Sequence, residues 1–244
     1  MEKSKKLGLI GRNISYSFSK SYFEEKFRNL MVNEYSYDIF DLQDITQVAH
    51  LFQDQHIKGF NVTIPYKEQI IPFLDELSEE AQQIGAVNTV KISADGKKTG
   101  HNTDAFGFEQ TLLIHKKPQH THALILGDGG AAKAVKYVLN KHNIAFKTVA
   151  RKSELNFEHL SAELVTQHGL IIQTTPVGTF PNVEDCLQFP FEALTEQHLI
   201  IDLIYNPNYT QFIKNAAEYG AKTINGYYML EQQAEKAWKI WNCD

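Results

Sequence analysis

The stretch "ALILGDGGAAKAV", residues 123–135, decides the fold class, because an apolar run enters a glycine-rich turn and then a helical pattern. Residues 123–126 carry no polar side chain, as expected for a parallel strand that is covered on both faces. Gly127, Gly129 and Gly130 follow directly. Backbone N–H groups in such a turn, at the positive end of a helix, can approach a pyrophosphate closely. The pattern favours a dinucleotide-binding strand–turn–helix, and the alternative is a tight turn without a ligand.

Strands and helical segments alternate through the rest of this half of the chain, which is typical of α/β folds. The segments expected as strands after the glycine turn are residues 146–151, 170–175, 199–205 and 222–225. Helices are expected over 105–114 and 209–220, and a final helix over 228–241. This half of the chain therefore predicts parallel strands with helices on the faces of their sheet.

The N-terminal part of the chain alternates in the same way and adds a hairpin. Residues 86–92 and 98–103 flank the turn "SADG", which indicates two antiparallel strands. Asp44 and Ser78 each precede a helical pattern, as N-cap residues do. The other expected elements are strands over 7–11, 35–40 and 59–64 and helices over 20–31, 45–53, 68–74 and 78–85. The predicted fold of this part is an α/β layer with a mixed sheet.

The composition is that of a globular protein of one large or two small domains, with 244 residues and a net charge of −5. This charge argues against a general nucleic-acid binder, which normally carries a basic face. No run of about 18 apolar residues occurs and the N-terminal apolar stretch is short, so we expect neither a membrane span nor a signal peptide. Cys186 and Cys243 fit no metal or redox spacing and predict ordinary thiols in a reducing cytoplasm.

Three histidines, His115, His120 and His122, lie in the polar stretch "HKKPQHTH". Metal binding is one interpretation, but no cysteine or acidic cluster completes a ligand set. A solvated loop that contains a proline is the simpler interpretation. We therefore predict no metal site.

Polar residues stand at the mouth of an apolar strand in "FNVTIPYKEQ", residues 60–69. Asn61 and Thr63 are two residues apart on a strand, so they share one face and can point at one ligand. Pro65 ends the strand, and Lys67 follows it. A positioned ammonium can stabilise developing negative charge and donate a proton. The alternative is an ordinary surface lysine after a turn.

A carboxylate beside Lys67 would orient its ammonium group and keep it cationic until a proton is needed. Asp104 is the candidate, because it lies directly after the predicted hairpin, where a helix begins. A plain helix N-cap is the alternative interpretation, and one carboxylate can hold both roles.

The second strand of the dinucleotide-binding unit ends with two basic residues, Arg151 and Lys152. Units that bind NAD usually end this strand with an acidic residue that bonds the ribose 2′-hydroxyl. A basic pair suits a 2′-phosphate instead, and arginine can bind it with two hydrogen bonds. NADP is therefore the preferred nucleotide, and a solvated basic turn is the alternative.

Several of these stretches together resemble the motifs of the shikimate dehydrogenase family. The family's N-V-T-x-P-[FY]-K, A-x-N-T and N-T-D-x-x-G motifs occur here in that order. Counterparts of its S-x-S segment, its glycine loop and three C-terminal motifs also occur, so the match spans the chain. The matching stretches are "ISYSFSK" (14–20), "NVTIPYK" (61–67), "AVNT" (86–89), "HNTDAFGF" (101–108), "GDGGAAKA" (127–134), "QTTPVGT" (173–179), "DLIYNP" (202–207) and "GYYMLEQQA" (226–234).

The resemblance implies a substrate-binding and catalytic domain over 1–104, completed by the C-terminal helix 227–244, and a Rossmann-like NADP-binding domain over 105–226. It implies the reversible reduction of 3-dehydroshikimate to shikimate by NADPH, a step of the shikimate pathway toward chorismate and the aromatic amino acids. The expected protein is cytoplasmic, a monomer or homodimer, with a small-molecule substrate and neither nucleic acid nor membrane as a partner.

The resemblance also implies roles for individual residues. Lys67 and Asp104 would be the catalytic pair. The residues that would hold the substrate are Ser17, Ser19, Asn61, Thr63, Asn88, Tyr205 and Gln233. The residues that would hold the cofactor are Gly127, Gly129, Gly130, Ala131, Arg151, Lys152, Thr174, Thr175, Pro176, Gly226 and Met229.

The sequence departs from the family pattern at positions around both sites and leaves two alternatives open. One is a quinate/shikimate dehydrogenase that uses NAD, and the other is a non-catalytic relative that binds a ligand. Intact Lys67 and Asp104 count against the second alternative. The departures are Asn13 and Lys20 in place of prolines, Ala150 and Gln173 in place of asparagines, Lys152 in place of threonine, Thr179 in place of methionine, and Tyr228 in place of glycine.

Overall fold

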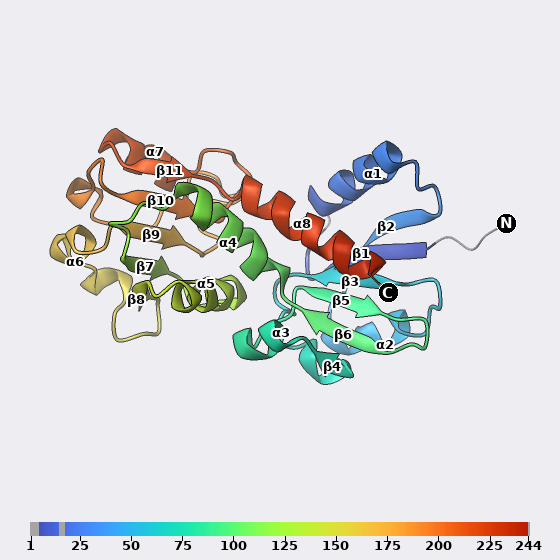
Figure 1. Cartoon of the computed structure of the whole chain (residues 1–244). Coiled ribbons are helices and arrows are strands. Elements are labelled where there is room, and N and C mark those ends of the chain that lie inside the picture. The colour runs from blue at the N-terminus through green and yellow to red at the C-terminus, as the bar shows by residue number, and fades with distance from the viewer. Residues whose placement is uncertain (1–4, 15–17, 244) are drawn as a thin grey trace. The chain divides into compact units, whose positions relative to one another are not determined.

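The computed structural model describes residues 5–14 and 18–243. The chain divides into two compact units, the first comprising Met1–Thr103 with Ala234–Asp244 and the second Asp104–Gln233. The first unit has a mixed sheet and the second a parallel sheet (Figure 1), which confirms the predicted α/β fold class.

The first unit is built on six strands, β1 (Lys5–Gly11), β2 (Tyr35–Asp41), β3 (Gly59–Val62), β4 (Glu76–Leu77), β5 (Thr89–Ile92) and β6 (Lys98–His101). They lie in the order β2-β1-β3-β5-β6-β4. β1 runs parallel to its neighbours β2 and β3, whereas β5 runs antiparallel to β3 and β6. The predicted hairpin is therefore confirmed as β5 and β6.

One face of this sheet is covered by α1 (Phe18–Leu30) and by the last part of α8 (Tyr227–Asn242). Their aromatic side chains pack on the buried residues of β1 and β2. Trp241 of α8 also donates its indole N–H to the carbonyl oxygen of Val90 at 2.9 Å. This hydrogen bond ties the C-terminal helix to β5.

The other face is covered by α2 (Val48–Leu51) and α3 (Glu79–Ile84), around Phe60 of β3. The predicted N-cap of α3 is confirmed, because the hydroxyl of Ser78 accepts a hydrogen bond from the backbone N–H of Ala81 at 3.2 Å. The sheet is thus covered on both faces, and its central strand β3 is buried along its whole length.

The helix predicted over 45–53 is shorter and tighter than expected. It consists of a 3-10 turn, η1 (Ile45–Gln47), followed by the single turn of α2. The predicted cap is confirmed, since the carboxylate of Asp44 accepts from the backbone N–H of Thr46 at 2.8 Å.

The helix predicted over 68–74 is wrong. Residues 64–70 form turns, and only Ile71–Phe73 (η2) forms a 3-10 helix. Pro72 lies within this segment, has no N–H to donate and crowds the preceding turn, so an α-helix cannot continue through it. The preceding strand also ends sooner than predicted, at Val62.

The second unit is built on five strands, β7 (His122–Leu126), β8 (Ala145–Val149), β9 (Leu170–Gln173), β10 (Leu199–Asp202) and β11 (Lys222–Ile224). They lie in the order β11-β10-β9-β7-β8, and every pair is parallel. The parallel sheet predicted for this half is therefore confirmed. Because all strands run the same way, the turns that follow them share one edge of the sheet.

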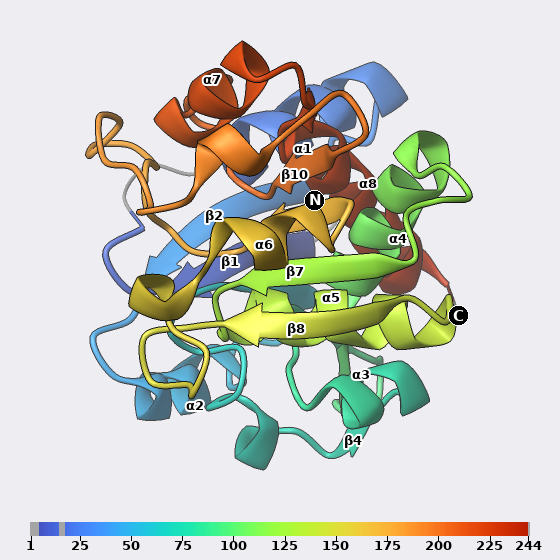
Figure 2. The ribbon, with the colours of Figure 1, turned by 90° about the vertical axis from the view of Figure 1, so that its left-hand side faces the viewer.

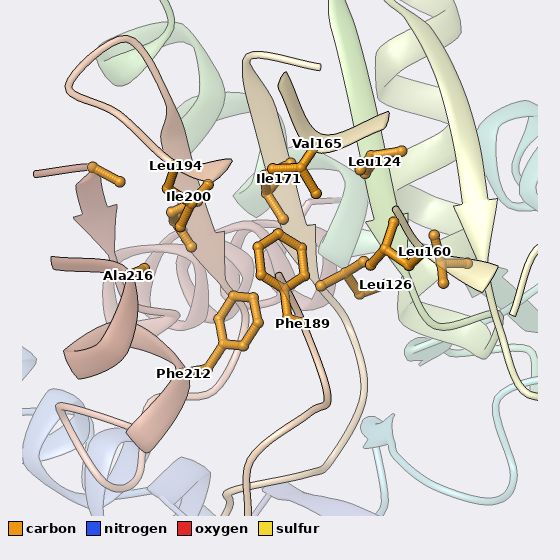
Figure 3. Close-up of a cluster of buried hydrophobic side chains, with 12 residues drawn as sticks. Leu124, Leu126, Leu160, Val165, Ile171, Phe189, Leu194, Ile200, Phe212 and Ala216 are labelled. Atoms are coloured by element: carbon orange, nitrogen blue, oxygen red, sulfur yellow. The ribbon is translucent and has the colours of Figure 1, made fainter. Parts of the chain in front are cut away.

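Helices cover both faces of the second sheet. Leu124 and Leu126 of β7 pack with Val165, Phe189 and Phe212 on one face (Figure 3). In Figure 2, α6 lies in front of β7 and α5 lies behind it. The pattern did not predict α6, because so short a helix has too few residues for a periodic signal. The elements of this unit besides its strands are the helices α4 (Thr103–His115), α5 (Gly130–Lys141), α6 (Ala162–Thr166) and α7 (Gln211–Glu218), the start of α8, and the 3-10 turns η3 (Phe157–His159) and η4 (Phe191–Ala193).

Candidate functional site

The glycine-rich turn after β7 begins with a residue that only glycine suits. Gly127 has a φ of +119°, and a Cβ atom there would lie 2.5 Å from the Oγ1 of Thr174. Thr174 donates both its backbone N–H and its hydroxyl to the carbonyl oxygen of Leu126, each at 2.9 Å. The turns after β7 and β9 therefore touch, and a side chain at position 127 would separate them.

The next glycine leaves the N-terminus of α5 open. Gly129 is the N-cap of this helix, and no side chain in the described part of the chain caps it. A Cβ atom at Gly129 would meet nothing within 4 Å. The N–H groups of the first turn, starting at Gly130 and Ala131, therefore point out of an uncovered helix end that carries partial positive charge. This arrangement fits a pyrophosphate.

The end of β8 lies beside the same turn. Gly127 donates its backbone N–H to the carbonyl oxygen of Val149 at 2.8 Å. Arg151 and Lys152 follow, and both are exposed. Neither makes a hydrogen bond or ion pair with any other residue that the structure describes. The turn that carries them is ordered, because the Ser153 hydroxyl donates to the carbonyl oxygen of Ala150 at 2.9 Å. Two exposed cations thus follow the end of the strand that is bonded to the glycine turn, and such cations suit a 2′-phosphate.

Gln173 orders the loop that follows β9. This residue stands where the family has asparagine, and its side chain is fully buried. Its amide oxygen accepts from the backbone N–H of Thr175, and its amide nitrogen donates to the carbonyl oxygen of Val177 at 3.2 Å. The longer side chain therefore closes the loop that contains Thr174, Thr175 and Pro176.

The loop after β10 is anchored by a buried carboxylate. Asp202 accepts from the Thr210 hydroxyl at 2.6 Å and from the backbone N–H of Ile204 at 3.0 Å. Burial raises the pKa of Asp202 to about 6, and these two hydrogen bonds oppose the shift. Tyr205, one of the expected substrate residues, lies on this loop and is half-buried.

Glycines also bring the start of α8 close to its neighbours in the second unit. A Cβ atom at Gly226 would lie 2.1 Å from the carbonyl oxygen of Leu203. A Cβ atom at Gly107 of α4 would lie 2.4 Å from the carbonyl oxygen of Met229. Gly226 and Met229 are therefore held by backbone contacts that allow no side chain at either glycine.

A chain of hydroxyl and amide groups crosses the first unit. The Ser19 hydroxyl, near the start of α1, hydrogen-bonds the hydroxyl of Tyr37. Tyr37 donates to the Oδ1 of Asn61 at 2.8 Å, and burial raises the pKa of its phenol well above the usual range. Asn61 donates through Nδ2 to the hydroxyl of Thr89 at 3.1 Å and to the carbonyl oxygen of Asn88 at 3.3 Å. Both amide hydrogens of Asn61 are thus committed to protein groups.

Asn88 connects this chain to the residue that precedes Asp104. Its Oδ1 accepts from the backbone N–H of Thr103 at 2.6 Å. Its Nδ2 donates to the Thr103 hydroxyl at 3.0 Å. Asp104 follows in the first turn of α4 and is 7% exposed. The backbone of Thr103 and the side chain of Asn88 therefore fix the point at which α4 begins.

The turn that carries Lys67 is tied to the segment that leads into β5. The carbonyl oxygen of Lys67 accepts a hydrogen bond from the backbone N–H of Val87 at 2.7 Å, and Val87 directly precedes Asn88. Tyr66 is fully buried and donates its hydroxyl to the carbonyl oxygen of Leu42 at 2.7 Å. Lys67 itself is half-buried. Tyr66 thus anchors the turn in the core, whereas the side chain of Lys67 is partly exposed.

Thr63 lies against the end of β1. Its backbone N–H donates to the carbonyl oxygen of Ile10 at 2.9 Å. A Cβ atom at Gly11 would lie 2.5 Å from the Cγ2 of Thr63, so this contact requires glycine. Thr63 is half-buried, whereas Asn61 is buried.

The structure brings part of the predicted set together. Ser19, Asn61 and Asn88 belong to one hydrogen-bonded chain in the first unit. Asp104, Tyr205 and Gln233 are counted in the second unit, and Gln233 is 8% exposed. The prediction for Ser17 lies outside the described residues.

Sequence reasoning missed three members of the chain in the first unit. Thr89 and Thr103 lie within the motifs "AVNT" and "HNTD", so the signal was present as two Asn–Thr pairs. Tyr37 gave only a weak signal, a tyrosine at an apolar position of the strand "YSYDIF". All three are at most 2% exposed, and each uses its hydroxyl inside the protein.

The described residues contain no cluster of three or more His, Cys, Asp or Glu side chains that could hold a metal ion. His120, one of the three histidines considered above, is buried instead. Its Nδ1 accepts from the backbone N–H of Lys117 at 3.1 Å, and its Nε2 bonds the carbonyl oxygen of Gln197 at 3.1 Å. Within the same residues, no helix has the length and apolar character needed to span a membrane.

Comparison with known proteins gives matches over nearly the whole chain. A profile of the shikimate dehydrogenase substrate binding domain matches residues 9–90. The chain is 37% identical over 268 residues to a shikimate dehydrogenase (NADP(+)) of Methanococcus maripaludis, a match that covers 98% of this chain and 92% of that protein.

Solved structures match equally well. A crystal structure of a shikimate dehydrogenase in complex with NADP+ superposes with a TM-score of 0.86 and 34% identity, over 98% of this chain and 90% of that one. A quinate dehydrogenase from Corynebacterium glutamicum in complex with NAD gives the same TM-score of 0.86 at 27% identity, over 98% of this chain and 94% of that one. Backbone similarity alone therefore does not distinguish the two substrates or the two cofactors.

Proposed function

Because this chain belongs to the shikimate dehydrogenase family, we propose that it catalyses the reversible reduction of 3-dehydroshikimate to shikimate with NADPH. One structural observation carries most of the weight. The open N-terminus of α5 stands next to the turn with Arg151 and Lys152, joined by the hydrogen bond from Gly127 to Val149. Backbone donors and cations are thus available together, one set for a pyrophosphate and the other for a 2′-phosphate.

Residues of the second unit would hold the cofactor. The N–H groups of Gly129, Gly130 and Ala131 would bind the pyrophosphate, and Arg151 with Lys152 would bind the 2′-phosphate. Thr174, Thr175 and Pro176 would lie along the nucleotide with Gly226 and Met229. When bound, NADPH supplies the hydride for ketone reduction, and NADP accepts it in the reverse direction.

Lys67 would be the proton donor. Reduction of a ketone develops negative charge on the carbonyl oxygen, and an ammonium group stabilises that charge and then donates its proton. In the oxidation of shikimate the neutral amine would take the proton of the hydroxyl. Asp104 would orient the ammonium group and keep it charged. The bonds of Thr103 to Asn88 support this role, because they fix the backbone directly before Asp104.

The remaining substrate residues would bind and orient. Ser17 and Ser19 would donate hydrogen bonds to the carboxylate, while Thr63, Asn88 and Gln233 would bind hydroxyl groups, with Tyr205 nearby. Asn61 is better suited to positioning than to contact, because both of its amide hydrogens already serve Asn88 and Thr89.

The proposal assigns separate duties to two parts of the chain, whose bounds differ slightly from those of the two compact units. Residues 1–104 with the C-terminal helix 227–244 would form the substrate domain, and 105–226 the NADP domain. The protein would work in the cytoplasm as a monomer or homodimer on a small-molecule substrate, without nucleic acid or membrane as a partner.

The test is identification of the product. Purified protein, 3-dehydroshikimate and NADPH should yield shikimate, identified by chromatography and mass spectrometry against an authentic standard. Lys67→Ala protein at the same concentration is the control for contaminating activity. If the wild-type protein consumes no 3-dehydroshikimate while its cofactor site binds NADPH, the proposed reaction is excluded.

A further inference from the structure

We propose that Lys136 is a positioning residue of the cofactor site, one that neutralises a carboxylate in the glycine turn so that a pyrophosphate can approach α5; this inference rests on the proposed function. The carboxylate belongs to Asp128, which stands between Gly127 and Gly129 and is exposed. It directly precedes the N-cap of α5, the helix end that would receive the pyrophosphate. A negative charge at this position opposes an anionic ligand unless a cation compensates it.

The ammonium group of Lys136 supplies this cation. Lys136 lies roughly two turns into α5, and side chains on a helix tilt toward its N-terminus. Its Nζ donates a hydrogen bond to the Oδ1 of Asp128, so the two groups form an ion pair. The side chain of Lys136 is 27% exposed and that of Asp128 is 55% exposed. The pair is therefore open to solvent on one side, where dissolved salt can screen it.

Each of these two side chains has one partner. Neither Asp128 nor Lys136 makes another side-chain hydrogen bond or ion pair with any residue that the structure describes. The carboxylate therefore does not bond the N–H groups of the first turn of α5, although the partial positive charge there attracts carboxylates. Without Lys136, the carboxylate could turn toward this helix end and compete with a pyrophosphate for the same N–H groups.

Loss of the cation should weaken both cofactors alike, because NADP and NAD share the pyrophosphate. At low ionic strength, Lys136→Ala should raise the dissociation constant for each by roughly three- to tenfold, as an uncompensated charge a few ångströms from an anion would. The two factors should agree within about twofold. A substitution at the 2′-phosphate would instead weaken NADP alone. Calorimetric titration of the purified protein with NADP and with NAD measures both constants.

Two further conditions identify the effect as one of charge. In about 1 M salt the Debye length falls to roughly 3 Å, so the rise caused by Lys136→Ala should shrink to less than about twofold. Lys136→Arg keeps a cation at this position and should bind both cofactors within about twofold of wild type. A loss of affinity that persists at high salt would contradict the proposal, because it would point to packing rather than charge.

A double-mutant cycle tests whether Lys136 acts through Asp128. Asp128→Asn removes the negative charge with little change of shape and should bind NADP as tightly as wild type or more tightly. In that background Lys136→Ala should raise the dissociation constant by no more than about 1.5-fold, because no charge is left to compensate. A full three- to tenfold rise in both backgrounds would show that Lys136 acts on the cofactor directly and would overturn the inference.

A matched control removes another lysine from the same helix. Lys141 lies in the last turn of α5 and pairs with Glu109 at 2.9 Å. Lys141→Ala changes the net charge of the protein by the same amount and should leave the NADP dissociation constant within about 1.5-fold of wild type. An equal loss of affinity in both variants would assign the effect to net charge and contradict the proposal. If Lys136→Ala is recovered unfolded, Lys136→Gln removes the charge while keeping most of the side chain and takes its place.

Binding without turnover separates this inference from the proposed function. If the wild-type protein binds NADP but reduces no 3-dehydroshikimate, the proposed reaction fails while the titrations still decide the inference. If the protein is active and Lys136→Ala is folded with an unchanged dissociation constant, the inference alone is overturned. A wild-type protein that binds neither NADP nor NAD would overturn both.

Discussion

Gly127 donates its backbone N–H to the carbonyl oxygen of Val149 at 2.8 Å, so the glycine turn after β7 and the end of β8 are held together by the main chain. Arg151 therefore follows a fixed point of the sheet, and its exposed side chain begins beside the uncapped N-terminus of α5. The preference between NADP and NAD should therefore depend on Arg151.

Arg151→Ala should remove most of the preference for NADP over NAD. A hydrogen bond to a charged group contributes about 1.5–3 kcal/mol, which corresponds to roughly 10- to 150-fold in affinity. NAD has no 2′-phosphate, so kcat/KM with NAD should change little. Steady-state kinetics with both cofactors measure the ratio. Lys147→Ala, which removes an exposed cation earlier on β8, is the control and should leave the ratio intact. An unchanged ratio in Arg151→Ala would assign the 2′-phosphate to other residues.

The two glycines of the turn should respond differently to alanine. Gly127→Ala needs a φ of +119° and sets a Cβ atom 2.5 Å from Thr174, so it should destabilise the protein by about 1–3 kcal/mol. Gly129→Ala meets nothing within 4 Å, so the cost should be about 1 kcal/mol or less. Its methyl group would instead obstruct the approach of a phosphate to the backbone, and NADP affinity should fall by at least about tenfold.

Urea denaturation and calorimetric titration with NADP separate these two effects. Equal destabilisation by both substitutions would show that the tight contact with Thr174 is not what requires glycine at position 127. Undiminished NADP affinity in Gly129→Ala would show that the pyrophosphate does not lie against the N-terminus of α5.

Lys67→Ala should lower kcat by roughly 10²- to 10⁴-fold, the usual contribution of a positioned general acid. NADP affinity and the melting temperature should stay near the wild-type values, because the backbone bond from Val87 to the carbonyl of residue 67 does not need the side chain. Lys58→Ala, which removes a half-buried lysine just before β3, should have full activity. A kcat within a few-fold of wild type in Lys67→Ala would remove the proton-donor role.

Buried histidines should make the protein less stable in mild acid. Burial lowers the pKa of His168 below its usual value of 6.5, aided by Lys147 and His122 and opposed by the bond to the Leu164 carbonyl. The folded state then binds fewer protons than the unfolded state at pH values just below 6.5, so stability rises with pH there and falls as the solution is acidified.

His168→Gln should therefore weaken the loss of melting temperature between about pH 6.5 and pH 5, as followed by scanning calorimetry. His159→Gln changes an exposed histidine of the same unit and should leave the slope as in wild type. A slope in His168→Gln that matches wild type would mean that protonation of this ring is not coupled to unfolding.

Local patterns predicted most of the fold because most elements carry their own signal. β7 is apolar from Ala123 to Leu126, and α3 begins after a serine that caps it. The elements that were missed or predicted wrongly depend on contacts distant in the sequence, or on one residue that overrides the local pattern. β4 has two residues, so it exists only through pairing with β6 and leaves no pattern in the sequence. The prediction of a helix over 68–74 relied on the spacing of apolar residues, and it neglected that Pro72 interrupts an α-helix.

Motifs located individual site residues but not the bonds between them. Asn61 and Asn88 could be named from the sequence, whereas the bond from Tyr37 to Asn61 spans 24 residues. It depends on the parallel register of β1 with β2 and β3, which no local pattern specifies. The hydrogen bond between Asn88 and the Thr103 hydroxyl also depends on tertiary structure, because it forms only once β5 and β6 pair.

The most direct test of the central claim is a set of four kcat/KM values, for shikimate and for quinate, each with NADP and with NAD. We predict the highest value for shikimate with NADP, at least about tenfold above shikimate with NAD, as expected if a guanidinium binds the 2′-phosphate. Both quinate values should lie below it. The highest value for quinate, or equal values for shikimate with the two cofactors, would contradict an NADP-dependent shikimate dehydrogenase and favour a quinate/shikimate dehydrogenase that uses NAD.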